Sequence, residues 1–280
     1  MKRFGFFFAL LTILTIMISC KDHKQSENTK ELTEDIEIEI IGENVSYATD
    51  STQLKGYMAY DKSQTKKRPG ILIVHEWWGH NDYVRERANM LAELGYTALA
   101  VDMYGDGKQA YHPDDAGKFA MSVMGNLPTA EARFKAAKQL LESHESVDGE
   151  NIAAIGYCFG GSVVLTMANS GMDLDAVAAF HSGVALPIMP NDKLKAQVLV
   201  CNGAADPFVS EESVTAYKTQ MDSIGANYKY ISYPGVKHSF TSKAADANGE
   251  KFGLPLAYNA EADKKSWNSL QELLKEAFDN

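Results

Sequence analysis

Cysteine and positive charge are both scarce in this chain of 280 residues. Its three cysteines are too few for the disulfide framework of a small secreted domain, so a buried hydrophobic core must stabilise the fold. Lys and Arg number 27 against 37 Asp and Glu, which gives a formal net charge of −10 and excludes a broad basic surface for nucleic acid. The histidines lack the close spacing of a metal-binding pair, and we expect neither a metal ion nor another cofactor.

Long hydrophobic runs are also rare, and the one that occurs covers residues 4–18 behind the basic start Met1-Lys2-Arg3. About fifteen apolar residues are short for the roughly 20 that cross a bilayer, which favours a secretory signal over a membrane span. The run ends in Met17-Ile18-Ser19-Cys20 and resembles a bacterial lipoprotein signal, with Cys20 as the lipidated residue. Simple cleavage and an uncleaved anchor remain the alternatives.

The N-terminal pattern divides the chain into three parts. We expect a signal peptide at residues 1–19, a flexible polar tether at 20–35 and one folded domain at 36–280. The expected location is the bacterial cell envelope, on the periplasmic or outer-membrane face, with membrane attachment through a lipid on Cys20. Without that lipid the protein would be secreted and soluble.

The pattern of the folded part predicts an α/β domain. The segment from residue 36 to 60 alternates apolar and polar residues, which predicts an antiparallel hairpin with strands at 36–42 and 45–60. From Gly70 onward, short apolar strands alternate with helical stretches, as in a mostly parallel, doubly wound sheet covered on both faces. Residues 246–250 are expected to form a turn.

The most informative segment is the strand, turn and helix around Cys158, with the letters IAAIGYCFGG at 152–161. A nucleophile on a sharp turn between strand and helix needs small neighbours, because larger side chains would collide with the backbone. The helix N-terminus directs its dipole and free N–H groups at the cysteine, and these can stabilise a thiolate and an oxyanion.

Two further residues complete a catalytic pattern. Asp206 follows one buried strand in NGAADPFV, and His238 follows the next strand in YPGVKHSF. The carboxyl ends of parallel strands meet at one edge of a sheet, where such folds bind ligands. The order nucleophile, acid, histidine is the chain order of α/β-hydrolases.

These motifs, together with GILIVHEWWG at residues 70–79, resemble the dienelactone hydrolase family of α/β-hydrolases over residues 36–280. The resemblance implies an α/β-hydrolase fold and a triad in which Cys158 attacks the acyl carbon, His238 transfers the proton and Asp206 orients the imidazole. It implies that Glu76 keeps the resting cysteine uncharged until substrate arrives; pairing of Glu76 with a nearby polar group is the structural alternative.

The same resemblance locates the rest of the site. The expected oxyanion donors are the backbone N–H groups of Phe159 and of Trp77 or Glu76. The substrate pocket is expected to be lined by four aromatic residues, Trp77, Trp78, Tyr104 and Phe240.

The chain departs from the family pattern where two arginines bind the carboxylate of dienelactone. Asp106 and Ser242 occupy those places, and only Lys108 or Lys243 could substitute by a shift in register. We therefore expect a small ester, lactone or thioester as substrate, preferably a neutral one. A binding lipoprotein that kept the fold and lost turnover is the alternative.

Overall fold

The computed structural model describes Met1 and residues 37–49 and 51–279. The chain divides into two units, Met1–Ile36 and Glu37–Asn280. The predicted signal peptide after Met1 and the whole predicted tether at 20–35, with Cys20, therefore lie outside the described residues. Within the described part, no helix combines the length and the apolar character of a membrane span.

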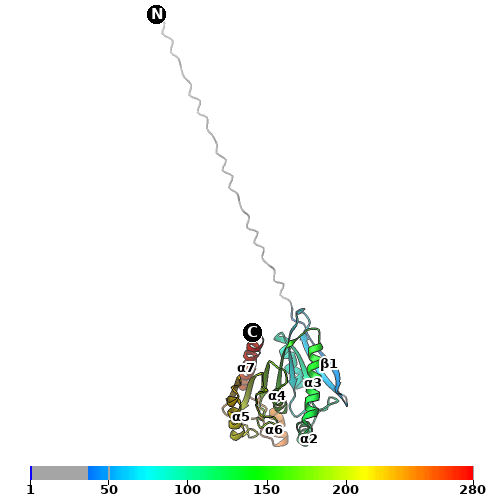
Figure 1. Ribbon diagram of the computed structural model, residues 1–280, viewed down its shortest axis with the longest axis vertical. Helices are drawn as coiled ribbons and strands as arrows, with labels where there is room; N and C mark the ends of the chain where they lie inside the picture. Colours follow the sequence, from blue (N-terminus) through cyan, green and yellow to red (C-terminus); the bar gives the residue numbers. More distant parts are fainter. Residues whose placement is uncertain (2–36, 50, 280) are drawn as a thin grey trace. The chain divides into compact units, whose positions relative to one another are not determined.

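One eight-stranded sheet forms the centre of the folded unit, in the order β1-β2-β4-β3-β5-β6-β7-β8 (Figure 1). The pairs β1–β2 and β2–β4 are antiparallel, and the five pairs from β4 to β8 are parallel. The strands are β1 (Ile40–Thr49), β2 (Thr52–Asp61), β3 (Arg68–Val74), β4 (Thr97–Val101), β5 (Val147–Tyr157), β6 (Ala176–Phe180), β7 (Gln197–Gly203) and β8 (Tyr228–Tyr233). This topology confirms the predicted mostly parallel sheet with an N-terminal hairpin.

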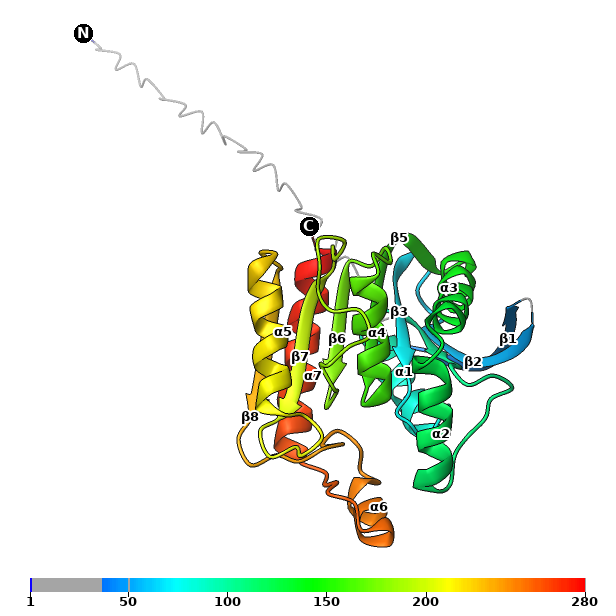
Figure 2. The same ribbon diagram turned by 60° about the horizontal axis from the view of Figure 1, so that its bottom comes forward.

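Helices cover both faces of the sheet (Figure 2). They are α1 (Asp82–Glu93), α2 (Pro113–Met124), α3 (Leu127–Ser143), α4 (Phe159–Asn169), α5 (Glu211–Ser223), α6 (Ala245–Phe252) and α7 (Ala260–Phe278). Buried side chains of α3, α4 and α5 form a hydrophobic core on one face, and those of α1 and α7 form a second core on the other. The central strands are therefore apolar on both sides, which explains their uninterrupted hydrophobic runs.

The hairpin and two helices differ from the sequence prediction. Thr49 pairs with Thr52, so the hairpin turn lies inside the segment predicted as one strand. The polar run TDSTQ at residues 49–53 spans the turn, but the prediction included it in the strand. The turn expected at 246–250 is wrong, because these residues belong to α6, and α2 was not predicted.

Candidate active site

Cys158 occupies a sharp turn between β5 and α4. Its backbone has φ 53° and ψ −115°, a region that a residue with a side chain seldom adopts and that persists only where the surroundings impose it. A Cβ atom at Gly156 would lie 2.1 Å from the carbonyl oxygen of Gly160, and one at Gly160 would lie 2.2 Å from that of Val74. The glycines beside the cysteine thus have the steric reason that the sequence suggested.

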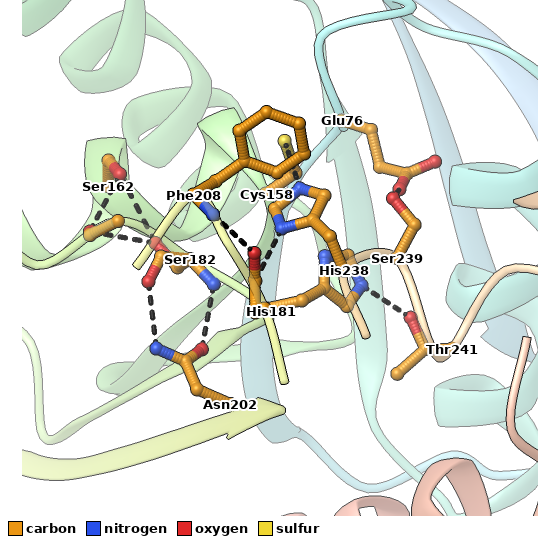
Figure 3. A network of polar contacts seen from close by, with 12 residues as sticks. Glu76, Cys158, Ser162, His181, Ser182, Asn202, Phe208, His238, Ser239 and Thr241 are labelled. Atoms are coloured by element: carbon orange, nitrogen blue, oxygen red, sulfur yellow. Dashed lines mark hydrogen bonds and ion pairs between the residues drawn. The ribbon is translucent and has the colours of Figure 1, made fainter. Parts of the chain in front are cut away.

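The structure brings Cys158, His238 and Asp206 into one hydrogen-bonded row (Figure 3). His238 Nε2 lies 3.1 Å from Cys158 Sγ, and His238 Nδ1 lies 2.7 Å from Asp206 Oδ2. Asp206 follows β7 and His238 follows β8, so both come from the carboxyl edge of the sheet, as expected.

The charges in this row favour a proton on His238. Burial of the imidazole opposes its charged form, but the charge of Cys158 and the hydrogen bond to Asp206 outweigh burial and raise the pKa of His238 to about 10. The side chain of Asp206 is fully buried, and its second oxygen accepts a hydrogen bond from the Phe208 backbone N–H at 2.9 Å. The carboxylate is therefore held in place from two sides.

Phe159 and Trp77, two predicted oxyanion donors, both line the cavity that opens on Cys158. Phe159 is the first residue of α4, so its N–H has no acceptor within the helix. The Trp77 carbonyl accepts a hydrogen bond from the Tyr104 hydroxyl at 2.9 Å, which fixes the loop after β3.

This cavity has a volume of about 260 Å³ and is mostly apolar. It contains no lysine, arginine, aspartate or glutamate among its lining residues. Phe208, Leu256 and Ala120 line it and were not predicted. Phe208 stands two residues after Asp206, so the motif could have indicated it, whereas Leu256 and Ala120 carry no chemical signal in the sequence.

Three of the four aromatic pocket predictions need revision. Trp77 lines the cavity at Cys158, but Trp78 lines a neighbouring cavity of about 250 Å³ together with Glu76. Tyr104 lies beneath the pocket wall and packs against Phe159. Phe240 is fully buried, so its prediction as a pocket residue is wrong. Its ring joins the hydrophobic core on the α1 and α7 face of the sheet.

Glu76 is almost completely buried beside the residue that follows His238. The Ser239 hydroxyl donates a hydrogen bond to Glu76 Oε1 at 3.0 Å. Burial raises the pKa of Glu76, against the opposing effects of Ser239 and of the nearby charges on His238 and Arg87. The sequence analysis gave pairing of Glu76 with a nearby polar group as the alternative to control of the thiol. Such a partner is present: it is Ser239, on the loop that carries His238.

The positions that replace the family arginines lie outside the Cys158 cavity. Asp106 is exposed and lies 4.0 Å from Lys108, and Lys243 lies 3.8 Å from Glu86. Ser242 lines the neighbouring cavity with Glu76. None of these four positions, including both lysines, lines the cavity at Cys158.

Metal-ligating groups do not gather in the described residues: no three His, Cys, Asp or Glu side chains there could hold an ion together. Cys201 lies in β7 and is fully buried.

Comparisons with known proteins identify the family and the fold. The model of the dienelactone hydrolase family matches residues 54–278. A putative carboxymethylenebutenolidase from Aquifex aeolicus is 24% identical over 208 residues, which cover 72% of this chain and 88% of that protein. The crystal structure of a dienelactone hydrolase-like promiscuous phosphotriesterase from metagenomic libraries is 32% identical, with a TM-score of 0.79 over 85% of this chain and 98% of that one. A structure titled m3DLH is 35% identical, with a TM-score of 0.81 over 85% and 99%.

Proposed function

Because this chain belongs to the dienelactone hydrolase family and is a hydrolase with an α/β-hydrolase fold, we propose that it cleaves a small ester, lactone or thioester through an acyl-cysteine. The observation that carries the proposal is the row of Cys158, His238 and Asp206 at the wall of an apolar cavity. A nucleophile, a base within hydrogen-bond reach and a group that orients the base are the arrangement that covalent acyl transfer needs.

In the proposed reaction, Cys158 Sγ attacks the acyl carbon as a thiolate while His238 carries the proton. The tetrahedral oxyanion accepts hydrogen bonds from the backbone N–H groups of Phe159 and Trp77. The bond to the leaving group breaks, and the imidazolium gives its proton to the departing alkoxide or thiolate. Water then attacks the acyl-cysteine, His238 takes its proton, and the carboxylic acid leaves.

Asp206 and Glu76 have different roles in this proposal. Asp206 holds the His238 ring through Nδ1, so that Nε2 faces the sulfur. Glu76 keeps the resting cysteine protonated, because a carboxylate near the site opposes a second negative charge. Its contact with Ser239 is the structural alternative and requires its own test.

The cavity supports a neutral acyl group as substrate. Its lining is largely apolar and includes no lysine or arginine that could hold a substrate carboxylate. The protein as a whole carries a net charge of −10, which also disfavours anionic ligands. We infer that carboxylate-bearing lactones are poor substrates here.

The proposed location is the cell envelope, with a lipid on Cys20 as the membrane attachment. The support is the N-terminal sequence alone: a basic start, an apolar run and a cysteine before a polar stretch. Intact mass of the protein from membranes would show diacylglyceryl and acyl additions on Cys20. Unmodified protein in the soluble fraction, or the loss of Cys20 with the signal, would contradict this.

The test of the chemistry is hydrolysis of a short-chain p-nitrophenyl ester by the wild type and by Cys158→Ala. Turnover should fall by a factor on the order of 10³ or more, because triad members act as a unit. Cys201→Ala is the matched control, since this thiol is buried in β7 away from the cavity. Mass spectrometry after a slow ester should find the adduct on the Cys158 peptide. Equal turnover in the Cys158 variant would overturn Cys158 as the nucleophile, and no turnover in the wild type would favour a binding protein instead.

A further inference from the structure

His181 lies beside His238 and has no role in the reaction proposed above. It follows β6 and is fully buried, with a backbone φ of 39° that a residue with a side chain rarely adopts. Its ring meets the His238 ring edge to face, with centroids 5.3 Å apart and planes at 72° (Figure 3). Strained and buried polar residues collect where a site must be held rigid.

A short hydrogen-bonded chain fixes the His181 ring. His181 Nε2 lies 2.7 Å from Thr241 Oγ1, and Thr241 Oγ1 lies 2.6 Å from the Tyr83 hydroxyl. Thr241 stands three residues after His238 on the same loop. Arg87 donates to the Thr241 carbonyl at 2.7 Å and anchors this loop to α1. The chain thus ties the end of β6 to the histidine loop and to α1.

The hydrogen bonds favour one tautomer of His181. Its Nδ1 is buried and has no hydrogen-bond partner in the described part of the chain. A proton on Nδ1 would be a buried donor without an acceptor, whereas a proton on Nε2 is satisfied by Thr241 Oγ1. Thr241 then donates to the Tyr83 oxygen. A second proton on His181 would create the unpaired donor again.

The charges around His181 also keep it neutral. Burial holds the pKa of His181 well below its usual value, and the charges on His238 and Arg87 act in the same direction. The other titratable groups that face it, Tyr83 and Tyr157, are uncharged phenols because burial raises the pKa of each. His238 therefore acquires its proton next to a neutral ring.

We propose that His181 is a positioning residue: its ring holds the His238 imidazole in line between Asp206 and Cys158. The hydrogen bond with Thr241 fixes the orientation of the His181 ring. Asp206 fixes only the Nδ1 end of His238, which leaves rotation of the ring about that hydrogen bond. Phe208 lies edge to face against His238 at 5.1 Å, but it is 54% exposed and free of the constraint that burial imposes. His181 is the rigid neighbour. This inference rests on the proposed function, because it concerns the geometry of the same reaction.

Thr241→Val tests the hydrogen bond between Thr241 and His181, because valine keeps the shape of threonine and removes the hydroxyl. We expect kcat for the p-nitrophenyl ester to fall about tenfold with KM unchanged, since one neutral hydrogen bond that orients the reacting group is lost. The rate of Cys158 alkylation by iodoacetamide should fall about threefold or more, because a misplaced imidazole pairs less well with the sulfur. Thr241→Ser keeps the hydroxyl and should restore both rates.

Two further variants separate positioning from stability. Tyr83→Phe keeps the contact between Thr241 and His181 and removes only the acceptor of the Thr241 proton, so both rates should fall by less than in Thr241→Val. His181→Phe keeps a ring against His238 but cannot bind Thr241, and its kcat loss should not add to that of Thr241→Val in the double variant.

Two results would overturn the inference. The first is a Thr241→Val variant whose kcat and alkylation rate equal those of the wild type while its melting temperature is lower. That result would give Thr241 a structural role alone. The other is additive losses in the double variant, which indicate that the two residues act separately. Failure of the proposed function looks different, because the wild type would then show no turnover that depends on Cys158.

Discussion

The close approach of α4 to β3 predicts that Gly160→Ala damages the site more than its small size suggests. The new Cβ atom would lie 2.2 Å from the Val74 carbonyl oxygen and 2.6 Å from that of His75. Both are backbone atoms, and neither can move aside as a side chain can. Ordinary contact requires the start of α4 to retreat by about 1 Å, a misplacement that can cost roughly 10²-fold in rate.

The retreat would separate the two expected oxyanion donors, because Phe159 begins α4 and Trp77 lies on the loop after β3. We expect kcat to fall by about 10²-fold and the free energy of unfolding to fall by about 1–3 kcal/mol, as overpacking usually costs. The melting temperature should fall about 2–4 °C for each kcal/mol.

Gly117→Ala is the matched control, because a Cβ atom there meets nothing within 4 Å. Gly117 lies inside α2, so alanine should raise the stability by about 0.5–1 kcal/mol and leave kcat unchanged. Thermal unfolding followed by circular dichroism and ester turnover at a temperature where both variants are folded measure the two effects. Wild-type stability and kcat in Gly160→Ala would refute the steric reasoning.

The remaining predictions concern charge and thiol reactivity. In Glu76→Gln, iodoacetamide should alkylate Cys158 faster at neutral pH and ester turnover should be slower. The substitution removes the negative neighbour of the thiol, while Ser239 can still donate a hydrogen bond to the amide oxygen. If the alkylation rates of the variant and the wild type superimpose at every pH and activity is full, Glu76 serves only the contact with Ser239. Neutral esters should show a higher kcat/KM than analogues with a free carboxylate near the scissile bond, and the reverse ranking would mean that a cation such as Lys108 or Lys243 reaches the substrate. Burial raises the pKa of Cys201 to about 12, so this thiol stays protonated between pH 7 and 9. Peptide mapping after alkylation in this range should therefore find the modification at Cys158. Rapid modification of Cys201 in the folded protein would show that β7 opens.

The sheet could be predicted from the sequence because each central parallel strand is buried on both faces. Runs such as QVLVCNG in β7 and IAAIGY in β5 have no exposed side, so their hydrophobicity is continuous and their ends are marked by glycine or a polar residue. The same logic located Cys158 and Asp206, which follow such strands within three residues, whereas His238 follows the half-exposed edge strand β8. Their meeting at 3.1 Å and 2.7 Å follows from the parallel arrangement.

Predictions from local sequence patterns failed where a side chain makes its contacts with residues distant in the sequence. Phe240 stands two residues after His238 and looks like a pocket residue, but the loop between them turns at Ser239, where φ is 56°. That turn directs the ring into the core beside Tyr233 and His181. The hairpin turn between Thr49 and Thr52 was missed for a different reason, since the polar run TDSTQ at 49–53 that marks it was included in the strand.

The reaction and its substrate are encoded in different parts of this fold, which is why the sequence predicts the first better than the second. The reacting groups stand at strand ends, where the sheet fixes their positions within a few residues. The cavity walls come from elements outside the sheet, such as Ala120 on α2, Leu256 after α6 and Phe208 in the loop after β7. A change in those walls alters what the cavity accepts without moving Cys158. The absence of arginine at positions 106 and 242 therefore concerns which substrate the cavity accepts. The intact row of Cys158, His238 and Asp206 concerns the type of reaction.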